Sequence, residues 1–478
     1  MKSSDKKPSK GITRRDALKL SGLALGGLAI GNAMVGPGAD IAQADDASGG
    51  GTIFNDPANR NTYFAMMRPY RPGSEPLGPY EMRISFLGTS CIPRISQTAV
   101  SVFVELGNGD SFVFDAGTGV VPKYFAMGHT LDKMDKIFIA HLHADHMGDL
   151  PFIYGFGPSY GRLWPLYIWG PNRSGFTFTA PDNTTRGPFN DGTADLTDAL
   201  TKMSVWHNES QSFLATGYSD YPVPGWGVPG KTDSYDIVTH ELDWTKKGDI
   251  DPATGLADNI AYNYNGVKIT HFPAVHTREG AISYKLEWNG LSMIYSGDTK
   301  PSQYIIDQAK SGVDVLIHEI VMPAADWNEK MGLPPEDVAW TQAVQDSSHT
   351  PQKAFGYILN QLGVKPNIAP RLAVGTHFQA EDDTIKSALH DIRLWYPRGN
   401  VVIASDLMVI NVSKNNIDVR RAVVSDYAWP QHTDTTLTSP NRPKYWKVDE
   451  TTGKPTSDPT AQLDPDAPVI DPDLYNAR

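Results

Sequence analysis

The sequence predicts an α/β protein, an αββα sandwich in which two β-sheets face each other and helices cover their outer sides. Apolar strand-like segments come first in hairpins and later alternate with amphipathic helices, and this order occurs in two successive halves. Histidines and aspartates follow the ends of several of these strands, where α/β sheets usually build their sites. Hydrophobic residues make up 40% of the chain, which is enough for a buried core.

Length, cysteine content and charge set the first limits on function. The chain has 478 residues, which suggests about two to three domains or one large domain with insertions. Its single cysteine, Cys91, rules out an intramolecular disulfide and a cysteine-rich zinc site, so any metal must be held by histidines and carboxylates. The formal net charge is −12, and it is −16 without the first 44 residues. We therefore expect no nucleic-acid partner, because the overall basic surface of such proteins is missing.

The first 44 residues are typical of an export signal. Thr13–Lys19 (TRRDALK) contains a twin-arginine pattern, the apolar run Leu20–Val35 follows it, and the run ends at the A-x-A cleavage site 42–44. The run is short and rich in glycine, which indicates a cleaved signal and no stable membrane anchor. We predict that the twin-arginine export machinery moves the folded protein to the periplasm or the medium.

Five strands are predicted in the first half of the chain. The turn Gly107–Asp110 (GNGD) joins the second and third strands as a hairpin, and the fourth runs directly into a group of histidines. The five strands are Met82–Gly88, Ala99–Leu106, Ser111–Phe114, Lys136–Ala140 and Pro165–Trp169.

The second half begins after a polar stretch rich in Gly, Pro, Asn and Asp, which predicts a loop-rich insertion over about 174–260. Strands and two amphipathic helices follow it: strands Gly266–His271, Ala281–Trp288, Ser292–Tyr295, Val313–Ile317, Arg371–Gly375, Val401–Ala404 and Asn416–Arg420, and helices Lys353–Leu362 and Asp383–Trp395. The predicted organisation is a signal peptide (1–44), an extended arm (45–81), one catalytic-type domain (82–429) and a Pro- and Asp-rich tail (430–478).

The segment His141–His146 (HLHADH) is the strongest chemical pattern in the chain. The chain turns at the end of the preceding strand, so that His141, His143, Asp145 and His146 can converge on one point. Neutral imidazoles and carboxylates are ligands of Zn²⁺ and of similar first-row ions.

Three further groups follow strand ends in the second half. His276 comes shortly after one predicted strand, with His271 as a competing ligand, and Asp298 and His377 follow two others. Because strand ends gather at one edge of such a sheet, we expect these side chains to join the first cluster.

These motifs resemble the metallo-β-lactamase superfamily, and their arrangement is similar to its ribonuclease Z and arylsulfatase-like branch. The resemblance runs in family order from about residue 82 to 410. Its motifs are FLGTS at 86–90, FDAG at 114–117, HLHADH at 141–146, PLYIWGP at 165–171, AVH at 274–276, SGDT at 296–299, HE at 318–319, HTP at 349–351 and TH at 376–377.

The resemblance implies the metallo-β-lactamase fold and a site for two Zn²⁺ ions, or another divalent first-row metal, between the two sheets. One metal would be held by His141, His143 and His276, and the other by Asp145, His146 and His377, with Asp298 bridging the two. Two such metals can bind a hydroxide between them and clamp an ester oxygen. Asp145 is therefore predicted to be catalytic as well as a ligand.

His318 is the residue to which the resemblance gives the second catalytic role, that of donating a proton to the leaving group. Glu319 would support its imidazolium form if the Glu319 side chain turned inward. His349 is expected to orient the ligands, and Asp115 to do the same from the end of its hairpin. Arg94, in the loop after the first strand, is a candidate for holding a substrate anion.

The sequence departs from the tRNA-processing members of the branch. Asp149 interrupts the apolar pair that usually follows the histidine motif, and Phe378–Glu381 replaces the serine and arginine that usually follow the last ligand histidine. We expect an exported zinc hydrolase that cleaves a small ester, with sulfate and phosphate esters preferred. Alternatives are a lactonase or thioesterase on the same site, a redox enzyme that uses iron, and a non-catalytic ligand-binding protein; a homo-oligomer is left open.

Export is predicted to require both signal arginines. Changing Arg14 and Arg15 together to lysine should trap the precursor in the cytoplasm, because the twin-arginine pair is the recognised address. Fractionation with immunoblotting measures this, and N-terminal sequencing of the wild-type product should begin at Asp45. Normal periplasmic accumulation of the double variant would contradict the prediction.

Overall fold

The structure, a computed structural model, describes residues 67–211, 234–363 and 369–430, together with 447–448, 451 and 455–456. The predicted signal peptide, residues 45–66 of the predicted arm and most of the predicted tail lie outside the described residues. Among the described helices, none has the length and apolarity needed to cross a membrane.

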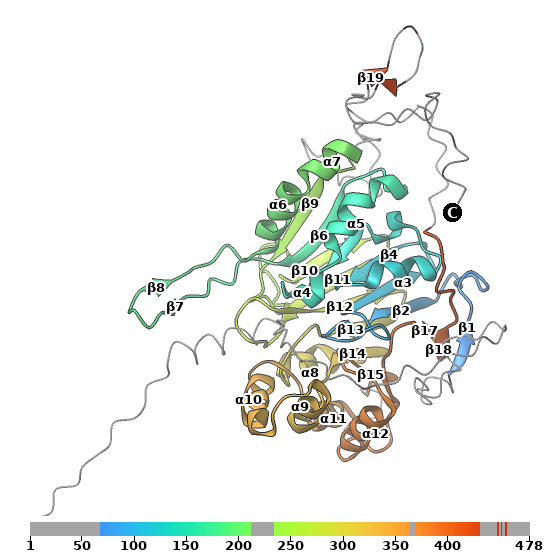
Figure 1. Ribbon diagram of the computed structural model, residues 1–478. Coiled ribbons are helices and arrows are strands. Elements are labelled where there is room, and N and C mark those ends of the chain that lie inside the picture. Colours follow the sequence, from blue (N-terminus) through green and yellow to red (C-terminus); the bar gives the residue numbers. More distant parts are fainter. Residues whose placement is uncertain are drawn as a thin grey trace, which may run out of the picture.

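Two large sheets face each other at the centre of the molecule (Figure 1). The nine-stranded sheet has the order β1 (Arg68–Tyr70), β18 (Ile417–Ala422), β17 (Met408–Val412), β2 (Met82–Gly88), β3 (Ser101–Leu106), β4 (Ser111–Phe114), β5 (Lys136–Phe138), β6 (Leu166–Pro171) and β9 (Ile237–Leu242). The seven-stranded sheet has the order β10 (Ile260–Tyr264), β11 (Val267–Pro273), β12 (Ile282–Trp288), β13 (Leu291–Tyr295), β14 (Val315–Glu319), β15 (Leu372–Thr376) and β16 (Val401–Ile403).

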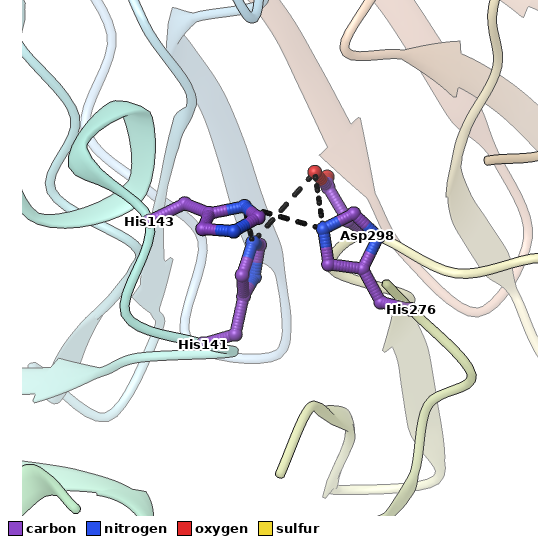
Figure 2. A group of neighbouring side chains, drawn as sticks. All are labelled: His141, His143, His276 and Asp298. Carbon is purple, nitrogen blue, oxygen red and sulfur yellow. Dashed lines mark hydrogen bonds and ion pairs between the residues drawn. The ribbon is translucent and has the colours of Figure 1, made fainter. Parts of the chain in front are cut away.

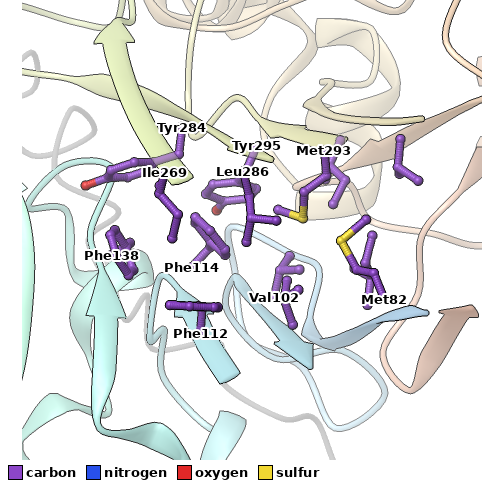
Figure 3. Packing of buried hydrophobic residues seen from close by; sticks show 14 of the residues in the cluster. Met82, Val102, Phe112, Phe114, Phe138, Ile269, Tyr284, Leu286, Met293 and Tyr295 are labelled. Carbon is purple, nitrogen blue, oxygen red and sulfur yellow. The ribbon is translucent and has the colours of Figure 1, made fainter. Parts of the chain in front are cut away.

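A hydrophobic core fills the space between the two sheets (Figure 3). Phe114 and Phe138 come from the nine-stranded sheet and contact Tyr284 of the other sheet, and Phe114 also contacts Tyr295. Neighbouring residues such as Phe103 and Val113 point to the opposite face, because successive strand side chains alternate. With both faces buried, the strands are nearly continuous runs of buried residues.

Helices cover both outer faces, which completes the predicted αββα sandwich and confirms the fold class. The nine-stranded sheet packs against α3, α5 and α6, and the seven-stranded sheet against α8, α11 and α12. The helices are α3 (Val120–Ala126), α4 (Ala144–Met147), α5 (Leu150–Phe156), α6 (Thr193–Met203), α7 (Val205–Gln211), α8 (Gln303–Ala309), α9 (Ala324–Met331), α10 (Val338–Ser348), α11 (Gln352–Gly363) and α12 (Asp382–Arg393).

The structure differs from the sequence-based expectation in the segment 174–260. The segment contains α6 and α7, and its strand β9 pairs in parallel with β6 at the edge of the nine-stranded sheet. The half-exposed, partly polar residues of β9 hid this strand from the pattern analysis. The short strands β7 (Phe178–Thr179) and β8 (Thr185–Arg186) form a hairpin that projects away from the sandwich (Figure 1).

Strand direction determines where the polar residues gather. β4, β5 and β6 are parallel, and so are β13, β14 and β15, while β11 and β13 both run antiparallel to β12. The carboxyl ends of β5, β11, β13, β14 and β15 therefore point to the same edge of the sandwich, where the histidine and aspartate motifs follow them.

Candidate metal centre

The seven predicted ligands lie together at this edge, in two groups that share Asp298. The first group contains His141, His143, His276 and Asp298, and the second contains Asp145, His146, Asp298 and His377. In each group the facing nitrogen and oxygen atoms lie within 4.8 Å of one another. The segment after β5 supplies four of the seven residues, and the ends of three strands of the other sheet supply the rest.

The first group is built around three imidazoles (Figure 2). His143 Nδ1 lies 2.9 Å from His141 Nε2 and 3.2 Å from His276 Nε2. Asp298 Oδ2 lies 3.8 Å from the Nε2 atoms of both His141 and His276. Burial lowers the pKa of His141 and His143, and it lowers that of His276 to about 3. Three neutral rings thus point their nitrogens at one volume.

The second group places two imidazoles between two carboxylates. His377 Nε2 lies 3.3 Å from Asp145 Oδ2 and 3.3 Å from Asp298 Oδ2. His146 Nε2 lies 3.3 Å from Asp298 Oδ1 and 3.6 Å from Asp145 Oδ2. Asp298 therefore presents one or both of its oxygens to each group, which is the geometry of a bridging ligand.

The donor set fits metal ions. Nitrogens bound at about 2.05 Å to one tetrahedral ion lie about 3.3 Å apart, which is close to the spacing in both groups. His146 Nε2 and Asp298 Oδ1 are buried and make no hydrogen bond within the described part of the chain, although they face each other. Buried polar atoms of this kind normally have a partner, and a cation shared by the two would supply it.

Electrostatics also favour positive charge here. Burial alone would raise the pKa of Asp298, but the imidazoles of His377 and His146 hold it well below its usual range. Burial lowers the pKa of His146, while the carboxylates of Asp298, Asp115 and Asp145 raise it well above its ordinary value. The second group therefore stabilises a cation, whether a proton or a metal ion.

Hydrogen bonds to the Nδ1 atoms of His146 and His276 orient these rings so that their Nε2 atoms face the other ligands. Asp115 is fully buried, and its Oδ2 lies 2.6 Å from His146 Nδ1 and accepts a 2.6 Å bond from the Tyr295 hydroxyl. The predicted orienting role of Asp115 fits this geometry. His276 Nδ1 lies 2.7 Å from the backbone oxygen of Ser348. The sequence did not predict such a role for Tyr295 or Ser348. An aromatic residue in a strand is expected in the hydrophobic core, and the partner of a backbone oxygen cannot be predicted from the residue type.

His271 lies outside both groups. Its Nε2 is 3.0 Å from the backbone oxygen of Asp243, and its ring is buried within β11. Between the two competing histidines, only His276 faces the other ligands.

The partly exposed His349 and the buried Glu319 form a pair beside the second group. His349 Nδ1 lies 3.0 Å from Glu319 Oε1, and the His349 ring stacks on the His377 ring with centroids 5.3 Å apart. Burial lowers the pKa of His349, but the Glu319 carboxylate more than offsets this and raises it to about 9. The Glu319 carboxylate thus favours the protonated form of His349 next to the candidate metal centre, and the His349 side chain remains 19% exposed.

His318 does not join the centre, contrary to its predicted catalytic role. Successive residues of a strand face opposite sides, and Glu319 is the one that faces the ligands. The His318 ring packs against Phe355 of α11, its centroid 5.1 Å away, and its Nδ1 lies 2.7 Å from the backbone oxygen of Glu319. Burial lowers its pKa to about 4. A neutral, fully enclosed ring is poorly suited to donate a proton to a substrate.

Arg94 and Asp149 have local partners. The Arg94 guanidinium pairs with Glu381 and with Gln97, so the structure does not leave it free for a substrate anion. Asp149 accepts hydrogen bonds from the backbone of Gly119 (2.9 Å) and Val121 (3.0 Å) at the start of α3. This sequence departure therefore fixes a helix and takes no part in the donor set.

This chain is similar in sequence to one protein family model and to several ribonucleases. A family model described as anti-Pycsar protein Apyc1 matches residues 82–156. Ribonuclease BN of Enterobacter sp. is 28% identical over 254 residues, which is 51% of this chain and 78% of the relative. Ribonuclease Z of Methanothermobacter thermautotrophicus is 25% identical over 362 residues, 69% of this chain and 97% of the relative. These relatives support the resemblance to the metallo-β-lactamase superfamily.

Two solved structures align with most of this chain at low sequence identity. The metallo-β-lactamase fold protein YhfI from Bacillus subtilis aligns with 70% of this chain and 100% of its own, at 16% identity and a TM-score of 0.44. The short form of human tRNase Z aligns with 69% of this chain and 98% of its own, at 18% identity and a TM-score of 0.42.

The two histidines near the end of β11 give a matched test of the donor set. His276→Ala should reduce the bound metal, because it removes one nitrogen of the first group. His271→Ala should leave the metal content unchanged, although it also truncates a buried imidazole. Metal analysis of the purified variants by mass spectrometry measures both, and loss of metal in the His271 variant alone would reverse the assignment.

Proposed function

We propose that the protein is an exported, metal-dependent hydrolase that cleaves a small ester, with sulfate and phosphate esters as the preferred substrates. The observation that carries the proposal is the shared carboxylate: Asp298 joins two complete donor groups at one edge of the sandwich. Six further ligands, His141, His143, Asp145, His146, His276 and His377, complete a site for two divalent ions, for which Zn²⁺ suits the nitrogen-rich donor set.

Two bound ions supply Lewis-acid polarisation of an ester oxygen and a water-derived nucleophile at neutral pH. The residues of this chain provide the rest of the chemistry. Asp115 and the backbone oxygen of Ser348 fix the orientation of His146 and His276. Asp145, whose side chain is 22% exposed, lies at the open side of the second group.

His349 is proposed to donate the proton that the leaving group needs, in place of His318. The Glu319 carboxylate raises its pKa to about 9, its side chain is partly exposed, and its ring lies beside His377. The Glu319 carboxylate, 3.0 Å away, keeps the ring in one orientation and stabilises its charge. Glu319 in turn accepts a 2.9 Å bond from the backbone of Thr299, directly after Asp298. Proton donor and candidate metal centre are thus parts of one hydrogen-bonded unit.

Two features support a small substrate from outside the cytoplasm. The first is the predicted twin-arginine signal, which addresses the protein to a compartment without tRNA precursors. The second is the net charge of −16 beyond residue 44, which disfavours long polyanions.

An RNA phosphodiester is the second candidate substrate. It is favoured by the relatives from Enterobacter sp. and Methanothermobacter thermautotrophicus, which are named ribonucleases. The same two donor groups can serve both reactions, so the substrate must be decided by activity.

A substrate panel tests the proposal. Purified, zinc-loaded protein should hydrolyse p-nitrophenyl sulfate or bis-p-nitrophenyl phosphate faster than it cleaves a 3′-extended tRNA precursor, with a lactone panel as the third arm. Dialysis against a chelator should abolish the activity, and added Zn²⁺ should restore it. Cleavage of the RNA alone would replace the small-ester proposal by the second candidate, and activity that survives metal removal would contradict the metallo-hydrolase itself.

A leaving-group comparison tests the role of His349. His349→Ala should lose about 10²–10⁴-fold in kcat on an alkyl ester, whose leaving oxygen needs a proton, and much less on a p-nitrophenyl ester. His318→Ala serves as the control, because its ring faces Phe355; any loss should be equal on both esters. The reverse pattern, with the selective loss in the His318 variant, would restore the original sequence-based assignment.

A further inference from the structure

The ligand His377 has an unusual backbone conformation. Its φ is +59°, in the left-handed region that side chains other than glycine rarely adopt. It directly follows β15, and its imidazole must turn back toward Asp145 and Asp298, both 3.3 Å away. A residue in this region keeps its conformation only where its surroundings hold it.

Gln97 contacts both sides of the turn that follows His377. Its Nε2 donates to the backbone oxygen of Phe378 at 3.0 Å, and its Oε1 accepts from the backbone nitrogen of Ala380 at 3.0 Å. The Phe378 nitrogen in turn donates to the backbone oxygen of Thr89 at 2.8 Å. One side-chain amide thus fixes the peptide groups on either side of Gln379.

Gln97 is itself held in place. It is 2% exposed, and its Nε2 also donates to the Thr89 hydroxyl at 2.8 Å. That hydroxyl donates to the buried carboxylate of Asp406 at 2.7 Å. Gln97 lies in the loop between β2 and β3 of the nine-stranded sheet, whereas His377 follows a strand of the seven-stranded sheet. The amide therefore joins the two sheets at the candidate metal centre.

We infer that Gln97 is a positioning residue for His377 and thereby sets the metal affinity of the second group. The inference rests on the proposed function, because it takes the two groups to be metal sites. The amide restrains the turn at Phe378 and Ala380, so that the imidazole stays aimed at Asp145 and Asp298. The first group, by contrast, receives none of the hydrogen bonds that Gln97 makes within the described residues. Loss of the Gln97 amide should thus weaken metal binding by the second group and leave metal binding by the first group unchanged.

Zinc titration of the metal-free full chain against a chelating dye tests the inference. Wild type should bind two equivalents. Gln97→Met, which keeps the volume but removes the amide, should bind the first equivalent normally and the second about 10- to 100-fold more weakly. His377→Ala gives the reference for a lost second equivalent. Gln97→Asn, which keeps an amide that is too short to reach both peptide groups, should show the same selective weakening if the methionine variant does not fold.

Asn328→Leu is the matched control. Asn328 is also 2% exposed, and its amide also bonds a hydroxyl, of Thr341 at 2.6 Å, and a backbone oxygen, of Pro334 at 3.3 Å. This variant should keep both zinc affinities. Wild-type affinity for the second equivalent in a folded Gln97 variant would overturn the inference, and so would unfolding of both Gln97 variants, since the amide would then stabilise the whole domain. Fewer than two equivalents in wild type would instead contradict the proposed function.

Discussion

The architecture of the candidate metal centre depends on one buried carboxylate. Asp298 is 2% exposed and lies between two sets of imidazoles, with Asp115 and Asp145 nearby. An ionised carboxylate in such a place is costly unless positive charge compensates it. Imidazole rings point their nitrogens at both sides of Asp298, and Asp298 thereby belongs to two groups of candidate metal ligands. The arrangement of the other ligands follows from this requirement.

The fold meets that requirement through strand direction: the segment after β5 supplies four ligands, and the ends of three strands of the other sheet supply the remaining three. Residues far apart in the chain converge because five strands from two sheets end at the same edge. In the aromatic core between the sheets, Phe114 of one sheet packs against Tyr284 and Tyr295 of the other and holds the two sheets together. The Tyr295 hydroxyl extends this core directly to Asp115 and thus to His146. Packing and ligand geometry are therefore coupled.

Much of this could be predicted from the sequence. The strands were visible because both faces are buried, and the ligand motifs were visible because each follows a strand end. Strands β1, β9 and β10 were missed because short, partly exposed strands lack a clear pattern, and β17 was missed although it is mostly buried. His318 was misplaced for a different reason: the sequence shows that His318 and Glu319 are neighbours on a strand, but not which of them faces the site. Gln97 gave no signal, because its role depends on a turn 281 to 283 residues away that only the folded chain brings near.

Anomalous diffraction from zinc-loaded crystals, measured on both sides of the zinc absorption edge, tests the central claim most directly. The account predicts two anomalous peaks, both in contact with the Asp298 carboxylate. One peak should be bound by the imidazoles of the first group, and the other by His146, His377 and Asp145. A single peak, or two peaks that do not share Asp298, would contradict the account.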